Sequence, residues 1–232
     1  CTTLLADRTY LLLCSDPTKE LSKLIEQHIT EAENKGWVNK KEVEFLINRN
    51  PKIPQFYTLS KIHKNRFPPP GWPIVAGIDS LLEPLSKYVD WFLLPLIPLM
   101  QSYVKDTKDI LNLVYDVTFN PETDWLIGLD VESLYTNIPQ QESLKIVEKI
   151  LGAQIWNYAA PPIEFVLRLA ELAWTRNYFE YRGTFYLQQH GTSMGSTFAP
   201  SLACLYVDDF EKENIWTNNP YTQEILLWRR YI

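Results

Sequence analysis

Asp130 is the acidic residue whose setting in this sequence could best support metal chemistry. A short apolar run at 125 to 129 predicts a buried strand, and Asp130 follows at its end. Tyr135 comes five residues later, and Pro139 then opens a predicted helix, because Pro costs nothing in a first turn. A carboxylate at a rigid strand end can help hold two divalent ions about 4 Å apart, as nucleotidyl transfer requires. The alternative is an ordinary acidic turn residue, which is the better interpretation of an isolated Asp.

The most basic stretch of the chain carries Lys61 and Lys64. It begins as a predicted strand, at 56 to 59, and a stiff proline-rich turn at 68 to 73 leads back into a second strand. Lysines on one arm of such a unit could contact a triphosphate or a template backbone. A charge run of this size is more often a solvated loop.

A loop with two glycines follows a predicted hairpin at 178 to 187. It contains Gln189, Gly191 and Gly195, and glycines four apart let the backbone approach a base pair closely. As a bare pattern this signal is weak.

Asp208 and Asp209 form an acidic pair that resembles a metal-binding motif but is rejected here as catalytic. The apolar residues around them fall on one helical face, and no turn signal for a hairpin follows them. We therefore expect a solvated acidic face of a helix.

The run Leu-Asp-Val-Glu-Ser-Leu-Tyr-Thr-Asn-Ile-Pro, at 129 to 139, closely resembles the first catalytic motif of reverse transcriptases from Penelope-like retroelements. The resemblance implies that Asp130 and the carbonyl of Val131 are metal ligands. It also implies that Tyr135 packs under the incoming sugar and rejects a 2′-hydroxyl, which favours deoxynucleotides. The alternative role of Tyr135 is that of a core aromatic.

Two more stretches resemble the same family. Residues 56 to 64, Phe-Tyr-Thr-Leu-Ser-Lys-Ile-His-Lys, are similar to its fingers segment, which implies phosphate contacts for the two lysines. Residues 188 to 196 are similar to its second palm motif, which implies contacts to the templating base and nucleotide for Gln189, Gly191 and Gly195. Trp72 departs from the pattern, because the family usually has there an Arg that grips the triphosphate.

The last residues, 225 to 232, predict a strand. In the family, Trp-Arg-Arg-Tyr-Ile runs straight into the Asp-Asp pair that completes the metal site, and here the sequence stops at Ile232. We therefore expect a chain that lacks the second carboxylate and the thumb, and that does not polymerise alone.

Composition sets broader limits. The chain has 232 residues, 46% of them hydrophobic, which is enough for a sizeable core. The net charge of −6, which is +1 over residues 1–100 and −7 over residues 101–232, does not by itself indicate a nucleic-acid binder. Cys1, Cys14 and Cys204 lack metal-ligand spacing and suggest a reducing compartment.

Local signals predict where two helices begin. Asn39 with Glu42, and Ser80 with Glu83, have the spacing of a capping box. The helix after Ser80 is predicted to place one apolar stripe on its buried side: Leu81, Leu85, Tyr88, Val89 and Phe92.

The sequence as a whole predicts an α+β fold, the fingers and palm of a right-hand polymerase. Residues 1–100 would form mainly helical fingers, and 101–232 an incomplete palm with an antiparallel sheet backed by helices. The implied function is that of an RNA-directed DNA polymerase, a nucleotidyltransferase from a retrotransposon. Its implied ligands are two Mg²⁺ ions in the complete enzyme, deoxynucleoside triphosphates, and an RNA or DNA template with primer.

Two other functions stay open. A degenerate or repurposed copy would bind nucleic acid or protein without catalysis, and Trp72 favours it. A palm polymerase that copies RNA with ribonucleotides is weaker, because Tyr135 stands at the gate position. The resemblance implies a nuclear location, and we expect no membrane partner, because the apolar run 91 to 100 is short and interrupted by prolines.

Overall fold

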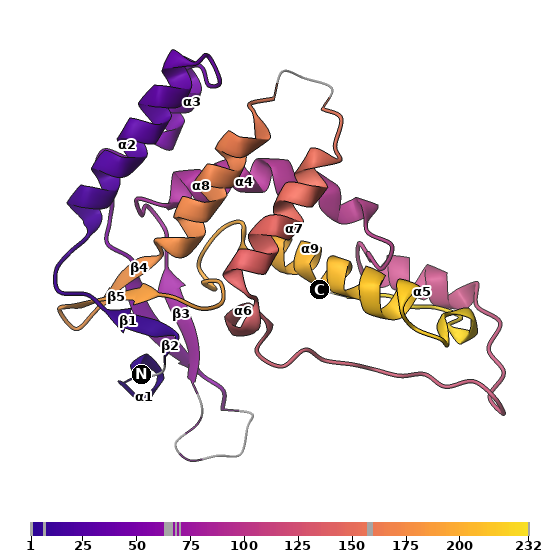
Figure 1. Cartoon of the computed structure of the whole chain (residues 1–232). Coiled ribbons are helices and arrows are strands. Elements are labelled where there is room, and N and C mark those ends of the chain that lie inside the picture. Colours follow the sequence, from indigo (N-terminus) through magenta and orange to yellow (C-terminus); the bar gives the residue numbers. More distant parts are fainter. Residues whose placement is uncertain are drawn as a thin grey trace.

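The structure is a computed structural model that describes residues 2–6, 8–62, 67, 69, 71–156 and 160–231. In these residues the fold is α+β and 48% helical, with a mixed five-stranded sheet (Figure 1). The strand order is β1-β5-β4-β2-β3, and neighbours are antiparallel except β2 and β4, which are parallel. The strands are Tyr10–Leu12 (β1), Gln55–Ser60 (β2), Gly71–Ala76 (β3), Tyr178–Tyr181 (β4) and Thr184–Gln188 (β5).

The helices lie mostly beside the sheet, where α4, α7, α8 and α9 gather (Figure 1). The α-helices are Thr2–Leu5 (α1), Thr18–Asn34 (α2), Lys40–Leu46 (α3), Glu83–Leu93 (α4), Thr107–Tyr115 (α5), Leu134–Asn137 (α6), Gln140–Gly152 (α7), Ile163–Thr175 (α8) and Ala199–Glu211 (α9). Shorter 3₁₀ segments are Leu94–Leu99 (η1) and Thr222–Glu224 (η3), and a π-helical segment is Lys212–Thr217 (η2).

The main core lies among these helices. Helix α4 packs against α8, and α7 packs against both α8 and α9. The predicted apolar stripe of α4 is buried, with Leu85 and Val89 inaccessible to solvent, and Leu169 on α8 is inaccessible as well. A smaller aromatic cluster lies on the sheet, where Phe56 stacks on Phe179 with 5.1 Å between ring centroids. Because strands and helices from both sides of residue 100 meet in the sheet and core, the boundary between fingers and palm stays a prediction.

Local signals in the sequence are confirmed at several places. Asn39 and Glu42 form the predicted capping box at the start of α3, with Asn39 N–H donating to the Glu42 carboxylate at 2.8 Å. The β4–β5 hairpin turns at Arg182 and Gly183, whose φ values of 53° and 78° are typical of a tight two-residue turn.

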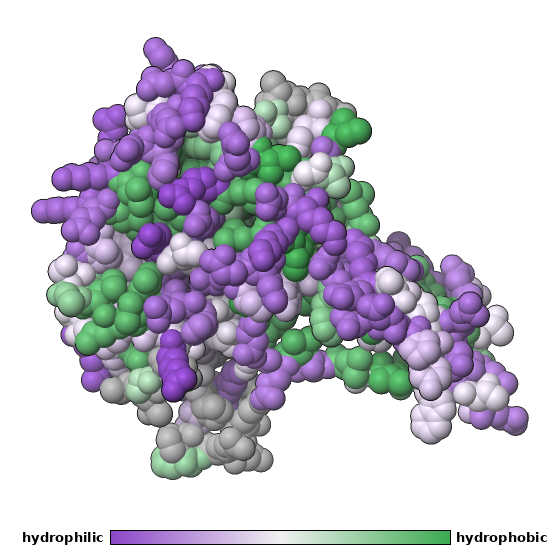
Figure 2. Space-filling model, in the orientation of Figure 1, coloured by the Kyte–Doolittle hydropathy of each residue, from purple (hydrophilic) through white to green (hydrophobic). Residues whose placement is uncertain are grey.

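The predicted buried strand at 125 to 129 is wrong. The segment is irregular and solvent-exposed, with 94% of Leu126 and 87% of Trp125 accessible. Figure 2 shows hydrophobic side chains at the surface along this stretch of chain, which runs below the helices in Figure 1. A strand needs a neighbour to take up its backbone hydrogen bonds, and in the described part of the chain none lies beside this segment. Gly128 within the run also weakens the preference for a strand.

The predicted strand at the end of the sequence is also wrong for the residues described. Residues 225 to 231 are irregular and make an isolated bridge, in which Arg230 N–H donates to the Ser102 carbonyl at 2.8 Å. The indole of Trp228 donates to the Glu211 carboxylate on α9 at 3.1 Å. The observed sheet is mixed because β2 and β4 run parallel, whereas we expected an antiparallel sheet within residues 101–232.

None of the helices in the described residues combines the length and the apolar composition that a membrane span requires.

Candidate functional site

A hollow of ≈ 610 Å³ brings together residues from four stretches of the sequence, at 4 to 10, 61 to 73, 130 to 137 and 194. It contains Lys61, Asp130, Val131 and Tyr135, four of the residues that sequence analysis singled out. Its volume is in the range of ligand pockets in proteins. The lining residues are Leu4, Thr9, Tyr10, Lys61, Gly71, Trp72, Pro73, Asp130, Val131, Glu132, Ser133, Leu134, Tyr135, Thr136, Asn137 and Met194. Lys64, the other predicted phosphate contact, lies outside the described residues.

The β2–β3 hairpin supplies the cationic wall of the hollow. Trp72 on β3 lies directly opposite Leu59 on β2, and Lys61 follows two residues after Leu59. The Lys61 ammonium lies 5.2 Å from the centroid of the Trp72 ring, within the range of a cation–π contact. The indole N–H of Trp72 donates to the sulfur of Met194.

Tyr135 lies on the short helix α6, after a residue in a left-handed conformation. Ser133 has φ 56°, and its carbonyl accepts from the Thr136 amide at 3.1 Å and from the Thr136 hydroxyl at 2.9 Å. The Tyr135 ring is half-buried against the main core. Burial, with a smaller contribution from Cys204, raises the pKa of the Tyr135 phenol, which therefore stays neutral at physiological pH. The residue is thus both a lining group of the hollow and a packed aromatic.

Gly191 packs behind Tyr135 and does not line the hollow. It has φ 69°, and an added Cβ would lie 2.6 Å from both the Thr136 Cα and the Tyr135 carbonyl oxygen. The next amide, Thr192 N–H, donates to that carbonyl at 2.7 Å, and the indole of Trp174 donates to the Gly191 carbonyl at 2.8 Å. The described contacts of Gly191 therefore position Tyr135.

Gly195 fixes the other end of the same loop to β3. An added Cβ would overlap the Val75 carbonyl, and the Gly195 carbonyl lies close to Gly77. Gln189 has an exposed side chain, and its backbone N–H donates to the Thr9 carbonyl at 2.8 Å. Gln189, Gly191 and Gly195 do not line the hollow. Their contacts with base and nucleotide therefore stay predictions.

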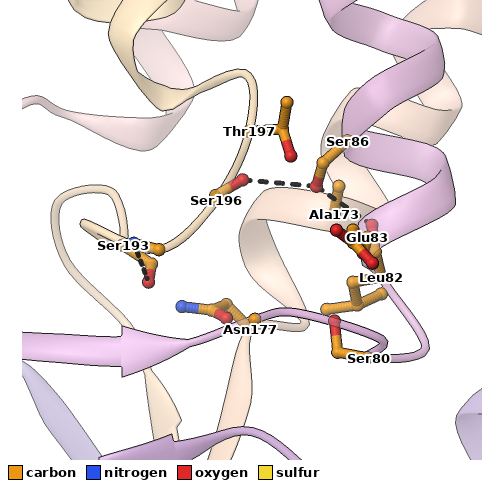
Figure 3. A pocket seen from close by; sticks show the side chains of 11 residues that line it. Ser80, Leu82, Glu83, Ser86, Ala173, Asn177, Ser193, Ser196 and Thr197 are labelled. Atoms are coloured by element: carbon orange, nitrogen blue, oxygen red, sulfur yellow. Dashed lines mark hydrogen bonds between the residues drawn. The ribbon is translucent and has the colours of Figure 1, made fainter. Parts of the chain in front are cut away.

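A small polar cavity lies behind this loop, between the end of β3 and the helices α4 and α8 (Figure 3). Its volume of ≈ 20 Å³ suits one ordered water, and its polar lining includes Ser80, Ser86, Asn177 and Ser193. The Ser196 hydroxyl, from the loop, is 3.2 Å from the Ser86 hydroxyl on α4. The cavity is too small for a substrate, and the contact between Ser196 and Ser86 joins the loop to α4.

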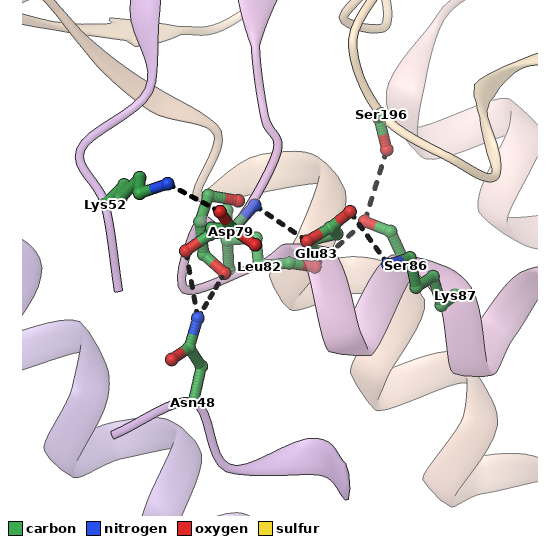
Figure 4. A network of polar contacts seen from close by, with 9 residues as sticks. Asn48, Lys52, Asp79, Leu82, Glu83, Ser86, Lys87 and Ser196 are labelled. Atoms are coloured by element: carbon green, nitrogen blue, oxygen red, sulfur yellow. Dashed lines mark hydrogen bonds and ion pairs between the residues drawn. The ribbon is translucent and has the colours of Figure 1, made fainter. Parts of the chain in front are cut away.

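Polar contacts also fix the exit of β3, as Figure 4 shows. Lys52 pairs with the Asp79 carboxylate at 2.7 Å, and Asn48 donates to the Asp79 carbonyl at 2.9 Å. The Asp79 amide donates to the Glu83 carboxylate at 2.8 Å, so Glu83 caps this turn and Ser80 does not form the capping box that its spacing suggested. These contacts hold β3, and with it Trp72, against the start of α4.

Asp130 is exposed at the rim of the hollow, with Glu132 as its acidic neighbour there. In the described residues, no three Asp, Glu, His or Cys side chains lie close enough together to hold a metal ion. A site for two Mg²⁺ ions needs more carboxylate oxygens than this arrangement offers. The residues that the structure describes around Asp130 and Val131 therefore do not fit the two-ion centre that the resemblance implies.

Asp208 and Asp209 lie on α9 and not in the hollow, and the predicted helix is confirmed. The expected solvated face is wrong for Asp208, which is 3% exposed and pairs with Lys212 at 2.6 Å. Asp209 pairs with Lys149 on α7 at 3.0 Å. Asp208 lies three residues before the buried Glu211, on the same side of α9, and its burial comes from other parts of the chain that a pattern within α9 alone could not indicate.

Met194 and Glu132 are two of the lining residues that sequence reasoning did not single out. Met194 lies between the two glycines of the loop, and Glu132 follows Asp130 by two residues. Their positions inside the two motifs were the available signal. Comparisons of the sequence with protein families and with curated proteins find no match.

Proposed function

We propose that this chain is the fingers and part of the palm of an RNA-directed DNA polymerase, and that its hollow receives a deoxynucleoside triphosphate. The observation that carries the proposal is the meeting of Lys61, Asp130 and Tyr135 in one hollow. Each belongs to a separate stretch that resembles a reverse-transcriptase motif. Chance resemblance in separate stretches would not require them to lie together.

Two lining residues suit two parts of such a ligand, the phosphates and the sugar. Lys61 offers a cation for phosphate oxygens, which a compact ammonium binds as a point charge. Tyr135 offers an aromatic ring that packs against the main core, and Gly191 packs against its backbone, so a ribose with an extra 2′-hydroxyl would meet a ring that cannot easily move away. The hollow would thus bind the phosphates through charge and select the sugar through shape.

The proposal for this chain alone is nucleotide binding without incorporation, because the residues around Asp130 do not fit a two-ion centre. Primer extension in Mg²⁺ should give no product above background. Product that disappears with Asp130→Ala would contradict this part of the proposal.

Binding of nucleotides, measured by calorimetry with and without a primer–template, tests the site itself. The wild-type chain should bind dATP about 10-fold more tightly than ATP, which corresponds to about 1.4 kcal/mol. Tyr135→Ala should remove this preference, and Tyr135→Phe should keep it because the ring remains. Equal binding of dATP and ATP by the wild type, or no binding of either, would overturn the proposal.

A second candidate function is that of a repurposed copy that binds nucleic acid or protein without using nucleotides. Trp72 in place of a triphosphate-gripping Arg favours it, because indole carries no charge. Binding of primer–template together with no binding of any nucleotide would support this candidate. Preference for ATP over dATP would instead point to an RNA-copying polymerase.

A further inference from the structure

Three side chains from two distant stretches build one wall of the hollow: Lys61, Trp72 and Met194. Trp72 and Leu59 are directly paired across the β2–β3 hairpin, and Lys61 is two residues beyond Leu59. Residues two apart along a strand point to the same face, so Lys61 is a diagonal neighbour of Trp72. The register of the hairpin therefore brings the lysine stem over the indole.

The contacts of the indole hold both of its partners. Its face receives the Lys61 ammonium at 5.2 Å from the ring centroid. Its N–H donates to the sulfur of Met194, which lies in the loop that Gly191 and Gly195 clamp to Tyr135 and to β3. A lysine side chain is long and loses much rotamer freedom when it is fixed. The anchored Trp72 ring already restricts the rotamers of Lys61, so a ligand that binds the ammonium has less side-chain freedom to remove.

We propose that Trp72 is a positioning residue, which holds the Lys61 ammonium in the hollow for the polyphosphate of a nucleotide. The inference rests on the proposed function and deepens it, because it assigns the phosphate end of the ligand to this wall. Asp130 and Glu132 line the hollow as well and repel an anion, so the phosphates bind on the Lys61 side. Lys61 thus supplies the positive charge, and Trp72 holds that charge in position.

Calorimetric titration with inorganic tripolyphosphate, without Mg²⁺, tests the wall apart from base, sugar and template. Lys61→Met should weaken binding about 10-fold, and Trp72→Leu about 3-fold, in line with a partly exposed cation–π contact. Trp72→Phe should bind nearly as well as wild type, because it keeps the ring face. In the Lys61→Met background, Trp72→Leu should cause no further loss, because the residue acts through the lysine.

A second lysine–tryptophan pair provides the matched control. Lys35 lies 4.4 Å from the centroid of the Trp37 ring, beside the end of α2, and neither residue lines the hollow. Lys35→Met changes the net charge as Lys61→Met does and should leave tripolyphosphate binding unchanged. Urea unfolding of every variant separates a loss of binding from a loss of fold.

The outcomes separate this inference from the proposed function. Three outcomes would overturn the role of Trp72. The wild type does not bind tripolyphosphate, or Trp72→Leu binds it as tightly as the wild type does. In the third, Trp72→Leu causes the same loss of binding in the Lys61→Met background as in the wild type. A coupled loss at Lys61 and Trp72 in a protein that does not distinguish dATP from ATP would support the inference and contradict the polymerase proposal. A protein that prefers dATP to ATP, but in which Trp72→Leu leaves tripolyphosphate binding unchanged, would support the polymerase proposal and contradict the inference.

Discussion

Two segments meet at the hollow, and they are held in opposite ways. The loop at 191 to 195 is anchored at both ends by backbone contacts, to Tyr135 and Thr136 at Gly191 and to Val75 at Gly195. The segment at 125 to 131, which ends with Asp130 and Val131, is exposed, and its backbone forms no hydrogen bond with another described residue. The side of the site that would shape a ligand is therefore fixed, and the side that carries the carboxylate is not.

The contrast shows which half of the proposed chemistry this chain can support by itself. Positioning of Tyr135 and Trp72 requires only contacts that are present among the described residues. A metal centre requires carboxylates held at short and constant distances, and an unpaired segment cannot hold Asp130 in that way. Nucleotide binding should therefore survive where nucleotidyl transfer does not.

Hydrogen exchange should show the largest difference between the two segments. The Thr192 amide, bonded to the Tyr135 carbonyl and buried, should exchange on the order of 1,000-fold more slowly than the Leu126 and Ile127 amides, which the described residues leave unbonded. Exchange followed by mass spectrometry or NMR measures the ratio. Strong protection at 125 to 131 would mean that the segment is paired in solution, as the sequence first suggested.

Substitution of one glycine in each segment should give the next largest difference, in the free energy of unfolding. In Gly195→Ala the new Cβ overlaps the Val75 carbonyl, and Val75 cannot move because it pairs with Phe56 in the sheet. We expect a loss of about 3 kcal/mol in the free energy of unfolding, from urea titration. Gly128→Ala, which has nothing within 4 Å, should change it by less than about 0.5 kcal/mol. Similar values for the two variants would contradict the anchoring of the loop.

Gly191→Ala should cost less stability and should act on the site. We expect a loss of about 2 kcal/mol, from the positive φ and the contact with Thr136. Gly183→Ala also has a positive φ but no atom within 4 Å, so it should cost about 1 kcal/mol and serves as the control. Displacement of Tyr135 in Gly191→Ala should also narrow the preference for dATP over ATP. An unchanged preference would mean that Gly191 does not position the ring.

Sequence patterns predicted the helices far better than the unpaired segments, and the reason is physical. The stripe of α4 and the capping box at Asn39 are local, so a short window of residues specifies them. A strand is defined by a partner that can lie anywhere in the chain, and the apolar run at 125 to 129 contains no information about whether that partner is present. The same limit applies to the last residues, 225 to 231.

The candidate site shows the same division: residues in local motifs were predictable, and contacts between distant residues were not. Lys61, Asp130 and Tyr135 were found from their motifs, and the structure brings them to one hollow. The glycine pattern indicated a close backbone approach, but the neighbours of Gly191 and Gly195 are non-local and could not be predicted. Met194 could not be assigned to the wall for the same reason, because its contact with Trp72 joins residues far apart in the sequence.

The smallest effect should come from the apolar side chains of the exposed segment. Leu126→Ser removes a side chain that is 94% accessible, so the free energy of unfolding should change by less than about 0.5 kcal/mol. Leu169→Ala on α8, which is fully buried, should lose about 3 kcal/mol under the same conditions. A loss of more than about 1 kcal/mol in Leu126→Ser would show that the segment packs in solution, and the distinction between an anchored and an unanchored side of the site would then fail.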